Sequence, residues 1–243
     1  PFAADARAAV RRGAAVLGRL VGVLEARGLT GAVDLVVTSD HGMAPTSPAR
    51  TIYLAACVDL ALLERMSGGN PSLVLWPRAG REETVLASLR GCHDALAVYG
   101  KEETPERLRW AGVGAGAGGL GERRIGPISV HAAEGWSLCL EEGGRCFNCC
   151  GTHGYDNALP SMHPLLVAAG PSFVVGPVRP KGEMHNVDVH PLLARLVGVE
   201  PAPGVNGSLV RTCELLREGC DEVVVEETWV EMVEQQSKGA AAG

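Results

Sequence analysis

Hydrophobic residues recur along the first 27 positions with the spacing of one face of an α-helix. Steps of four and three residues alternate between the apolar positions, which are Val10, Ala14, Leu17, Val21 and Leu24. The pattern predicts an amphipathic helix over residues 3–27, ended by Gly28 and Gly31. Because its apolar face is rich in alanine and shallow, we expect this helix to pack against a sheet rather than to lie on a membrane surface.

A short apolar run follows the predicted helix. Residues 33–39 read VDLVVTS and are bounded by Gly-Ala before and Asp-His-Gly after. A β-branched run of this length indicates a buried parallel strand, so a helix followed by such a strand predicts an α/β fold. We expect further strands at residues 72–76, 95–98, 128–131 and 165–168, and helices at 58–66, 82–91 and 189–197.

Two segments lack a clear hydrophobic period. Residues 112–121 read GVGAGAGGLG and contain a G-x-G-x-x-G at Gly114, Gly116 and Gly119. A dinucleotide-binding fingerprint requires a strand before the glycines and a helix after them, and neither is expected here, so we interpret the run as a flexible insertion. We assign residues 1–212 to one domain and residues 213–243 to a peripheral acidic tail.

Composition narrows the class of protein. The 243 residues are 46% hydrophobic and 21% charged, which is enough to bury a substantial core. With 22 basic and 28 acidic side chains, the formal charge of −6 argues against a nucleic acid duplex as partner. No run approaches the roughly 18 apolar residues of a membrane span, and the first 25 residues do not resemble a signal peptide. Because the chain opens at Pro1 rather than Met, we expect an upstream segment to be missing, and a signal or anchor can belong to it.

The chain has eight cysteines, and four of them cluster at Cys139, Cys146, Cys149 and Cys150. An even number and this clustering suit disulfides in a secretory compartment, but they equally suit a metal site or reduced thiols. One alternative is a structural zinc site formed by Cys146, Cys149, Cys150 and His153, because C-x-x-C is a ligand spacing.

Candidate metal ligands follow the predicted strand. The carboxyl ends of parallel strands are where α/β sheets hold ligands, and Asp40, His41 and Gly42 come directly after this strand. A carboxylate and an imidazole suit a first-row transition metal such as zinc, and Gly42 permits the turn that brings both to one ion. His153 lies between small residues in GTHGYDN, which leaves its ring room to reach across a cleft. For both segments an ordinary structural loop is the alternative.

Five motifs in order resemble the nucleotide pyrophosphatase/phosphodiesterase family of the alkaline phosphatase superfamily. They are TSDHGM (38–43), IYL (52–54), GTHGYDN (151–157), MHPLLVAAGPSF (162–173) and NVDVHPLLARLVGVEPAPGVNGSL (186–209). The resemblance implies an alkaline-phosphatase-like three-layer α/β/α sandwich, of which this chain is an incomplete carboxyl-terminal portion. It also implies a hydrolase that cleaves phosphodiester or phosphoanhydride bonds in a nucleotide, another phosphodiester or a choline-containing phospholipid.

The same resemblance implies a site with two zinc ions. Asp40 and His41 are then ligands of one zinc, and His153 is a ligand of the other. Two cations side by side stabilise both the attacking and the leaving oxygen of phosphoryl transfer. Tyr155, Asp156 and Asn157 follow a ligand, so they either shape its surroundings or form a turn.

The sequence also departs from the family. The Thr or Ser nucleophile and the remaining metal ligands of the family lie upstream of the region that matches, and no Thr here has the nucleophile's context. We therefore expect no catalytic nucleophile in this chain, no activity of the isolated chain, and the missing upstream half as its partner. Alternatives are an inactive binding module, a sulfatase or a cofactor-independent mutase. The family is extracellular, and Asn206-Gly207-Ser208 is a glycosylation sequon if the protein is secreted.

Overall fold

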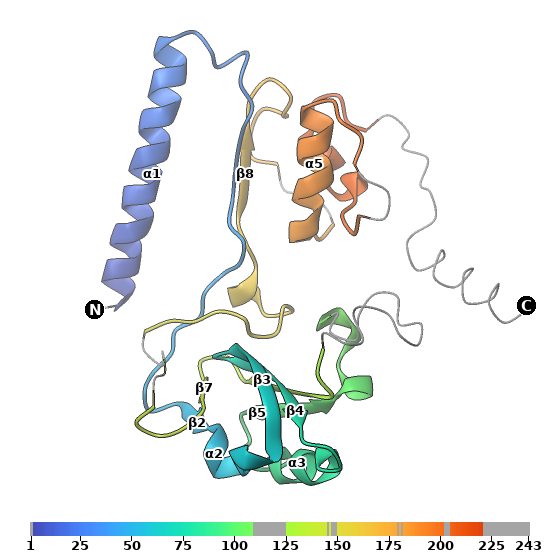
Figure 1. Ribbon diagram of the computed structural model, residues 1–243. Coiled ribbons are helices and arrows are strands. Elements are labelled where there is room, and N and C mark those ends of the chain that lie inside the picture. Colours follow the sequence, from blue (N-terminus) through green and yellow to red (C-terminus); the bar gives the residue numbers. More distant parts are fainter. Residues whose placement is uncertain are drawn as a thin grey trace, which may run out of the picture. The chain divides into compact units, whose positions relative to one another are not determined.

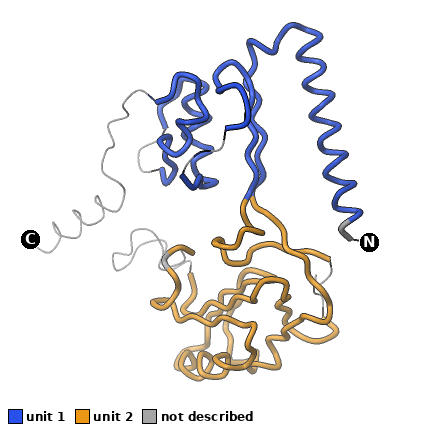
Figure 2. The backbone as a smooth tube through the Cα atoms, turned by 180° about the vertical axis from the view of Figure 1, so that it is seen from behind, with its two compact units in different colours: residues 1–40, 164–243 blue, residues 41–163 orange. Residues whose placement is uncertain are grey.

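The computed structural model describes residues 2–108, 125–144, 146, 150–178, 180, 182–201 and 205–220 (Figure 1). The predicted glycine-rich insertion at 112–121 and residues 221–243 of the predicted tail lie outside the described residues. The chain forms two compact units, one of residues 1–40 with 164–243 and the other of residues 41–163 (Figure 2). Each unit has a hydrophobic cluster of its own. Each unit contains both helices and strands, as expected for a mixed fold of helices and sheets.

The first unit is built on a two-stranded ribbon. Strand β1 (Leu35–Thr38) pairs with β8 (Leu166–Ala169) in antiparallel orientation, with Val36 opposite Ala168. These two residues pack on a core of Phe173, Leu192 and Leu216. The remaining elements of this unit are α1 (Phe2–Ala26), α5 (Val189–Leu196) and the 3₁₀ turns η5 (Asn186–Asp188) and η6 (Leu209–Leu215).

The interpretation of residues 33–39 as a buried parallel strand is wrong in two respects. Strand β1 is antiparallel to β8, and its residues are half-buried or exposed. One side of the ribbon packs on the core, whereas Val167 on β8 is 61% exposed. A run of apolar residues indicates a strand, but it contains no information on the direction of the partner strand. The predicted parallel orientation was wrong for this reason.

The predicted amino-terminal helix is confirmed, whereas its packing on a sheet is not seen. Helix α1 leaves Val10 72%, Leu20 43% and Val21 37% exposed. A helix of this length with a bare apolar stripe is stabilised mainly by tertiary packing of that stripe. In the described part of the chain this stripe is therefore largely uncovered.

A buried carboxylate organises the carboxyl-terminal part of the first unit. The side chain of Asp188 is fully buried and accepts hydrogen bonds from the backbone N–H groups of His185 and Ser208, each at 2.8 Å. Arg211 donates two more, at 2.7 and 2.6 Å. Burial alone would raise the pKa of Asp188, but the bonds from Arg211, Ser208 and His185 outweigh it and lower the pKa. Asp188 thus ties η5 and the start of α5 to η6.

The second unit contains a four-stranded antiparallel sheet in the order β3-β4-β6-β5. Its strands are β3 (Leu63–Gly69), β4 (Ser72–Pro77), β5 (Leu96–Gly100) and β6 (Ile128–Ala132). Strand β2 (Thr51–Tyr53) pairs in parallel with β7 (Ser137–Cys139). The helices are α2 (Leu54–Cys57) and α3 (Glu82–Leu89), with 3₁₀ turns η1 (Leu60–Leu62), η2 (Lys101–Glu103), η3 (Glu106–Leu108) and η4 (Pro160–Met162).

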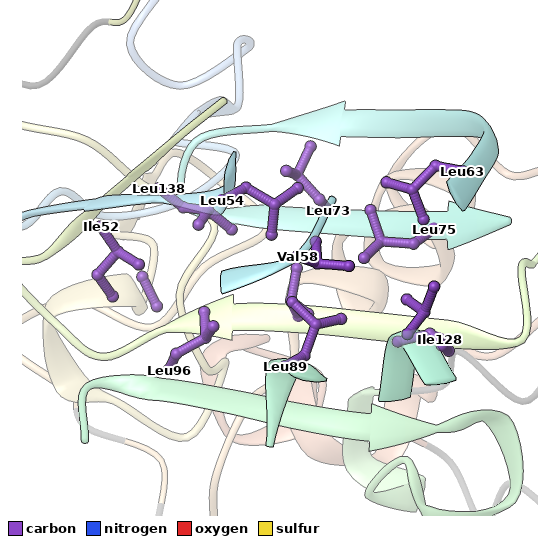
Figure 3. Close-up of a cluster of buried hydrophobic side chains, with 13 residues drawn as sticks. Ile52, Leu54, Val58, Leu63, Leu73, Leu75, Leu89, Leu96, Ile128 and Leu138 are labelled. Carbon is purple, nitrogen blue, oxygen red and sulfur yellow. The ribbon is translucent and has the colours of Figure 1, made fainter. Parts of the chain in front are cut away.

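The register of this sheet turns one set of side chains toward the main core and the other set toward the opposite face. Leu73 lies opposite Val130 and Leu75 opposite Ile128, and these side chains join Val85 and Leu89 of α3 in the main core of the unit (Figure 3). The residues between them point to the other face because neighbouring side chains on a strand alternate. That second face begins with Ser72 opposite His131.

Most of the predicted elements of the second unit are confirmed, but the helix at 58–66 is wrong. Strands at 72–76, 95–98 and 128–131 correspond to β4, β5 and β6, and the helix at 82–91 corresponds to α3. Residues 58–66 instead form the turn η1 and the start of β3. Val58, Leu62 and Met66 are spaced like a helical stripe, yet pairing with β4 outweighs this local preference. Strands β2 and β7 and helix α2 were not predicted.

Disulfides join Cys57 to Cys92, Cys139 to Cys146 and Cys213 to Cys220. Cys150 is also disulfide-bonded. The prediction that the cysteine cluster contains a disulfide partner is confirmed. The alternative of a structural zinc site is excluded, because Cys146 and Cys150 have no thiolate to offer.

We predict that Asp188→Asn loosens the carboxyl-terminal part of the first unit. Removing one member of a buried ion pair leaves Arg211 without its partner, and such changes cost about 3 kcal/mol. Amide hydrogen exchange of residues 185–211, followed by mass spectrometry, is expected to accelerate about 100-fold. Because the folded pKa of Asp188 is lowered, its contribution is fully present above the unfolded value near 3.9 and is lost as pH falls through the folded pKa.

The matched control is Glu218→Gln, which removes the exposed ion pair with Arg195, whose charged atoms are 3.9 Å apart. Exposed pairs contribute little, so this variant is expected to exchange like the parent. Equal exchange in both variants and the parent would contradict the role given to Asp188.

Candidate functional site

The two histidine segments of the second unit are held together by backbone hydrogen bonds. Ala44 and Thr152 exchange two N–H···O bonds of 2.9 Å each, as an isolated antiparallel bridge. Gly42 N–H donates to the carbonyl of Met162 at 2.9 Å. A Cβ atom at Gly42 would lie 2.0 Å from the Ser161 carbonyl oxygen, so this approach excludes every residue except glycine.

The bridge brings the imidazoles of His41 and His153 together. Their ring centroids lie 3.6 Å apart and their planes differ by 15°, so the rings are stacked. The two residues are 112 positions apart in the chain (153 − 41). His41 is half-buried and His153 is exposed.

The hydrogen bond of His41 defines which of its ring nitrogens carries the proton. Its Nδ1 lies 2.8 Å from the carbonyl oxygen of Gly42. Because a carbonyl oxygen can only accept, Nδ1 must carry the proton, which leaves the lone pair on Nε2. Histidine ligands of metals commonly donate their second nitrogen to a backbone carbonyl in this way. The donor chemistry of His41 therefore fits zinc.

Asp40 is the last residue of the first unit, and its backbone carbonyl accepts a hydrogen bond of 2.9 Å from Asn186. His153 belongs to the second unit, so the convergence of Asp40 with His153 stays a prediction. Among the residues that the structure describes, no group of three or more His, Cys, Asp or Glu side chains is arranged to hold a metal ion. A zinc site normally takes three protein ligands, so these residues fit part of such a site.

The three residues that follow Gly154 bond to other parts of the second unit. Tyr155 is buried beside Ala44 and Met162, its hydroxyl donates to the carbonyl of Trp136 at 2.8 Å, and burial raises its pKa. Asn157 donates to the carbonyl of Arg107 at 2.9 Å. Both side chains anchor the His153 segment to the protein.

Asp156 forms an ion pair with Arg107. Arg107 Nε donates to one carboxylate oxygen at 3.1 Å, and its terminal nitrogen donates to the other. These bonds lower the pKa of Asp156 and raise the pKa of Arg107. The N–H of Ala158 closes a turn on the same carboxylate at 3.0 Å, so Asp156 both forms a turn and fastens it.

A cavity of about 280 Å³ adjoins this segment. Its lining includes Gly154, Asp156, Ser72, His131, Tyr99 and Glu134. Sequence analysis did not single out Ser72, His131 or Arg107. The alternation of residues 128–131 in a predicted strand was the signal that Ser129 and His131 share a face, but nothing in the sequence indicated that this face meets the His153 segment.

Comparisons with known proteins identify the family of this chain. Residues 1–156 match the family described as type I phosphodiesterase / nucleotide pyrophosphatase. The chain belongs to this family. It is 35% identical over 210 residues to human bis(5'-adenosyl)-triphosphatase ENPP4, a match that covers 84% of this chain and 42% of that protein. It is 33% identical over 211 residues to human ectonucleotide pyrophosphatase/phosphodiesterase family member 5, with 86% and 40% covered.

A solved structure of murine ENPP5 has the same fold over the shared region. It superposes with a TM-score of 0.69 at 34% identity and covers 82% of this chain and 50% of the ENPP5 chain. An inactive form of murine ENPP5 in complex with AMP gives the same values. The likeness confirms the predicted alkaline-phosphatase-like α/β fold. The chain spans less than half the length of the human phosphodiesterase relatives named above.

Proposed function

We propose that this chain is part of a metal-dependent phosphodiesterase or nucleotide pyrophosphatase that acts through two zinc ions. In this proposal Asp40 and His41 bind one zinc and His153 binds the other. The observation that carries it is the stacked pair of His41 and His153, with the proton of His41 held on Nδ1 by the Gly42 carbonyl. Membership of the phosphodiesterase family supports the reaction class.

The chain's own residues have a limited part in such a reaction. Bound zinc supplies Lewis acidity for the phosphoryl oxygens and lowers the pKa of a water molecule. His41 and His153 present imidazole nitrogens from two loops, and the Ala44–Thr152 bridge keeps the loops at a fixed separation. The Gly42 carbonyl holds the proton of His41 on Nδ1, away from the metal side. Tyr155 and Asp156 fasten the second loop to Trp136 and to Arg107 of η3.

We infer that the substrate is a nucleotide phosphoanhydride or diester rather than a phospholipid. Human ENPP4 is named as a bis(5'-adenosyl)-triphosphatase, and one murine ENPP5 structure is a complex with AMP. Both relatives are about one third identical to this chain. The alternative is an inactive remnant that serves as a folded or binding module. It is favoured by one observation: fewer than three metal-binding side chains gather at any place among the described residues.

The proposed partner is the part of a phosphodiesterase catalytic domain that this chain does not cover. Two surfaces of the first unit suit it. The apolar stripe of α1 is exposed, and β8 presents Val167 with 61% of its surface exposed on the side of the ribbon away from the core. Among the described residues, β1 and β8 pair only with each other, so each has an open edge. Further strands and an apolar layer would complete such a ribbon.

We also propose that the protein enters the secretory pathway. Three disulfides among the described residues are typical of an oxidising compartment. The name of one human relative includes "ectonucleotide". In the described part of the chain, no helix is both long enough and apolar enough to cross a bilayer.

We predict that the isolated chain does not hydrolyse the nitrophenyl ester of thymidine monophosphate. Its rate with zinc is expected to equal that of the His41→Ala, His153→Ala double variant, since two or three ligands without a nucleophile cannot complete the reaction. Joined with the portion of murine ENPP5 outside the matched region, the chain is expected to gain activity, and either substitution is expected to reduce it at least 100-fold. The assay measures nitrophenolate release with zinc and with chelator.

His190→Ala serves as the control, because it removes an exposed histidine of α5 to which the proposal gives no metal role. Zinc-dependent turnover by the isolated chain that the double variant lacks would refute the inactivity. A joined protein without turnover, although folded, would favour the binding module.

We predict that Val167→Glu weakens association with the unmatched portion of murine ENPP5 about tenfold or more. A charge placed in an apolar interface is costly to bury. Light scattering after size exclusion measures the complex, independently of activity. Val199→Glu is the matched control, because Val199 is 59% exposed but follows α5 and is not part of the ribbon. Equal effects of both changes, or a homodimer in place of the complex, would overturn this assignment.

We predict a single N-linked glycan, at Asn206, in protein secreted from mammalian cells. Asn206 is exposed and begins the sequon Asn206-Gly207-Ser208. Asn70-Pro71-Ser72 is not a substrate, because proline in the middle position blocks the sequon. Peptide N-glycosidase is expected to shift the mass of the parent but not that of Asn206→Gln. A shift that persists in the variant, or no shift in secreted parent protein, would contradict the proposal.

A further inference from the structure

A pair of polar side chains lies on the face of the four-stranded sheet opposite its core. Strands β4 and β6 pair so that Ser72 is directly opposite His131. Directly opposite residues of an antiparallel pair share a face and lie close enough for their side chains to interact. Leu73 and Val130, the next pair along, occupy the apolar face instead. The same register that builds the core therefore sets these two polar groups side by side.

The two side chains form a hydrogen-bonded chain that ends on the His153 segment. Ser72 Oγ lies 3.0 Å from the carbonyl oxygen of Gly154, and His131 Nδ1 lies 3.0 Å from Ser72 Oγ. A carbonyl oxygen only accepts, so the single hydroxyl proton of Ser72 goes to Gly154. Ser72 must then accept from His131, and Nδ1 of His131 carries a proton. Burial lowers the pKa of His131, which favours its neutral form.

The acceptor of this chain is the residue directly after His153. On the other side of His153, Thr152 is fixed by its two backbone bonds to Ala44. Gly154 has a φ of +93°, and a Cβ there would lie 3.4 Å from Pro71, the residue before Ser72. His153 is thus held on both flanks, by the Ala44 bridge before it and by Ser72 after it.

The Ser72 bond lies beside a cavity. The cavity of about 280 Å³ is lined by Ser72, His131 and Gly154, so these groups border open space rather than a filled core. The Arg107–Asp156 ion pair acts two residues further along the chain. Loss of the Ser72 hydroxyl would therefore release the Gly154 carbonyl to water and leave the His153 ring less constrained.

We propose that Ser72 and His131 are positioning residues that fix the imidazole of His153 against His41. His131 orients the Ser72 hydroxyl, and Ser72 holds the backbone that bears the ring. This assignment deepens the proposed function, on which the role of His153 as a metal ligand rests. Neither residue touches the metal or the substrate in this proposal.

The test compares Ser72→Ala with Ser72→Thr, which keeps the hydroxyl, and with Ser67→Ala, a change at an exposed position of β3 that is a matched control. The first readout is metal-free: NMR of the ring protons of His41 and His153 in chelator. Ser72→Ala is expected to shift these signals toward the values of unstacked rings, while Ser72→Thr and Ser67→Ala keep them. His131→Ala is expected to act like Ser72→Ala, and His131→Asn, which retains a donor near Nδ1, is expected to restore the signals in part.

The second readout is zinc affinity, measured by titrating zinc into the same samples. Ser72→Ala is expected to weaken binding about tenfold at an unchanged melting temperature, as loss of a group that orients a ligand does. Unchanged ring signals in Ser72→Ala would overturn the positioning role, and so would an equal change in Ser67→Ala. If the ring signals move but the parent chain joined with the unmatched portion of murine ENPP5 binds zinc no more tightly than its His153→Ala variant, the positioning stands and the proposed metal role of His153 fails. If Ser72→Ala unfolds, the test uses Ser72→Thr and His131→Ala instead. Ring signals that stay unchanged in His131→Ala, while Ser72→Thr behaves like the parent, would overturn the role of His131.

Discussion

The antiparallel pairing of β4 with β6 is the constraint on which the described part of the second unit depends. It places Leu73 against Val130 and Leu75 against Ile128, and these pairs contribute to the core that packs on α3. Because side chains alternate along a strand, the same register turns Ser72 and His131 to the opposite face. A slip of one residue would exchange the two faces, exposing the leucines and burying the polar pair. Stability of the core and placement of the His153 segment thus follow from one register.

The geometry of the candidate site depends on backbone contacts more than on the histidine side chains by which its motifs are recognised. Gly42 lies so close to the Ser161 carbonyl that no side chain fits, and Ala44 pairs with Thr152 through main-chain atoms alone. These contacts bring His41 and His153 into ring contact across more than a hundred residues. Glycine and other small residues beside the histidines are therefore as necessary for the geometry as the imidazoles themselves.

Sequence patterns predicted elements where local preference and tertiary pairing agree, as in β4, β6, α3 and α5. They failed at residues 58–66, where helical spacing of Val58, Leu62 and Met66 competes with the pairing of β3 on β4. The direction of β1 was also missed, because an apolar run does not name its partner strand. Asp40, His41 and His153 were found through family resemblance, and their metal role stays a prediction. Ser72, His131 and Arg107 were not predictable, since their contacts join segments 49 to 82 residues apart.

The proposed function requires a stable scaffold that holds only part of a catalytic site. Folding of a unit requires one continuous core, and residues 41–163 have one in the cluster around Leu75 and Ile128. Two-metal phosphoryl transfer instead needs ligands and a nucleophile that converge from several strands of a larger sheet. The ribbon of β1 and β8, with Val167 exposed and its outer edges open among the described residues, is where a larger sheet would continue. The core of a unit forms within one stretch of chain, whereas the proposed reaction needs residues from several strands of a larger sheet. The fold of each unit therefore depends on fewer residues than the proposed activity does.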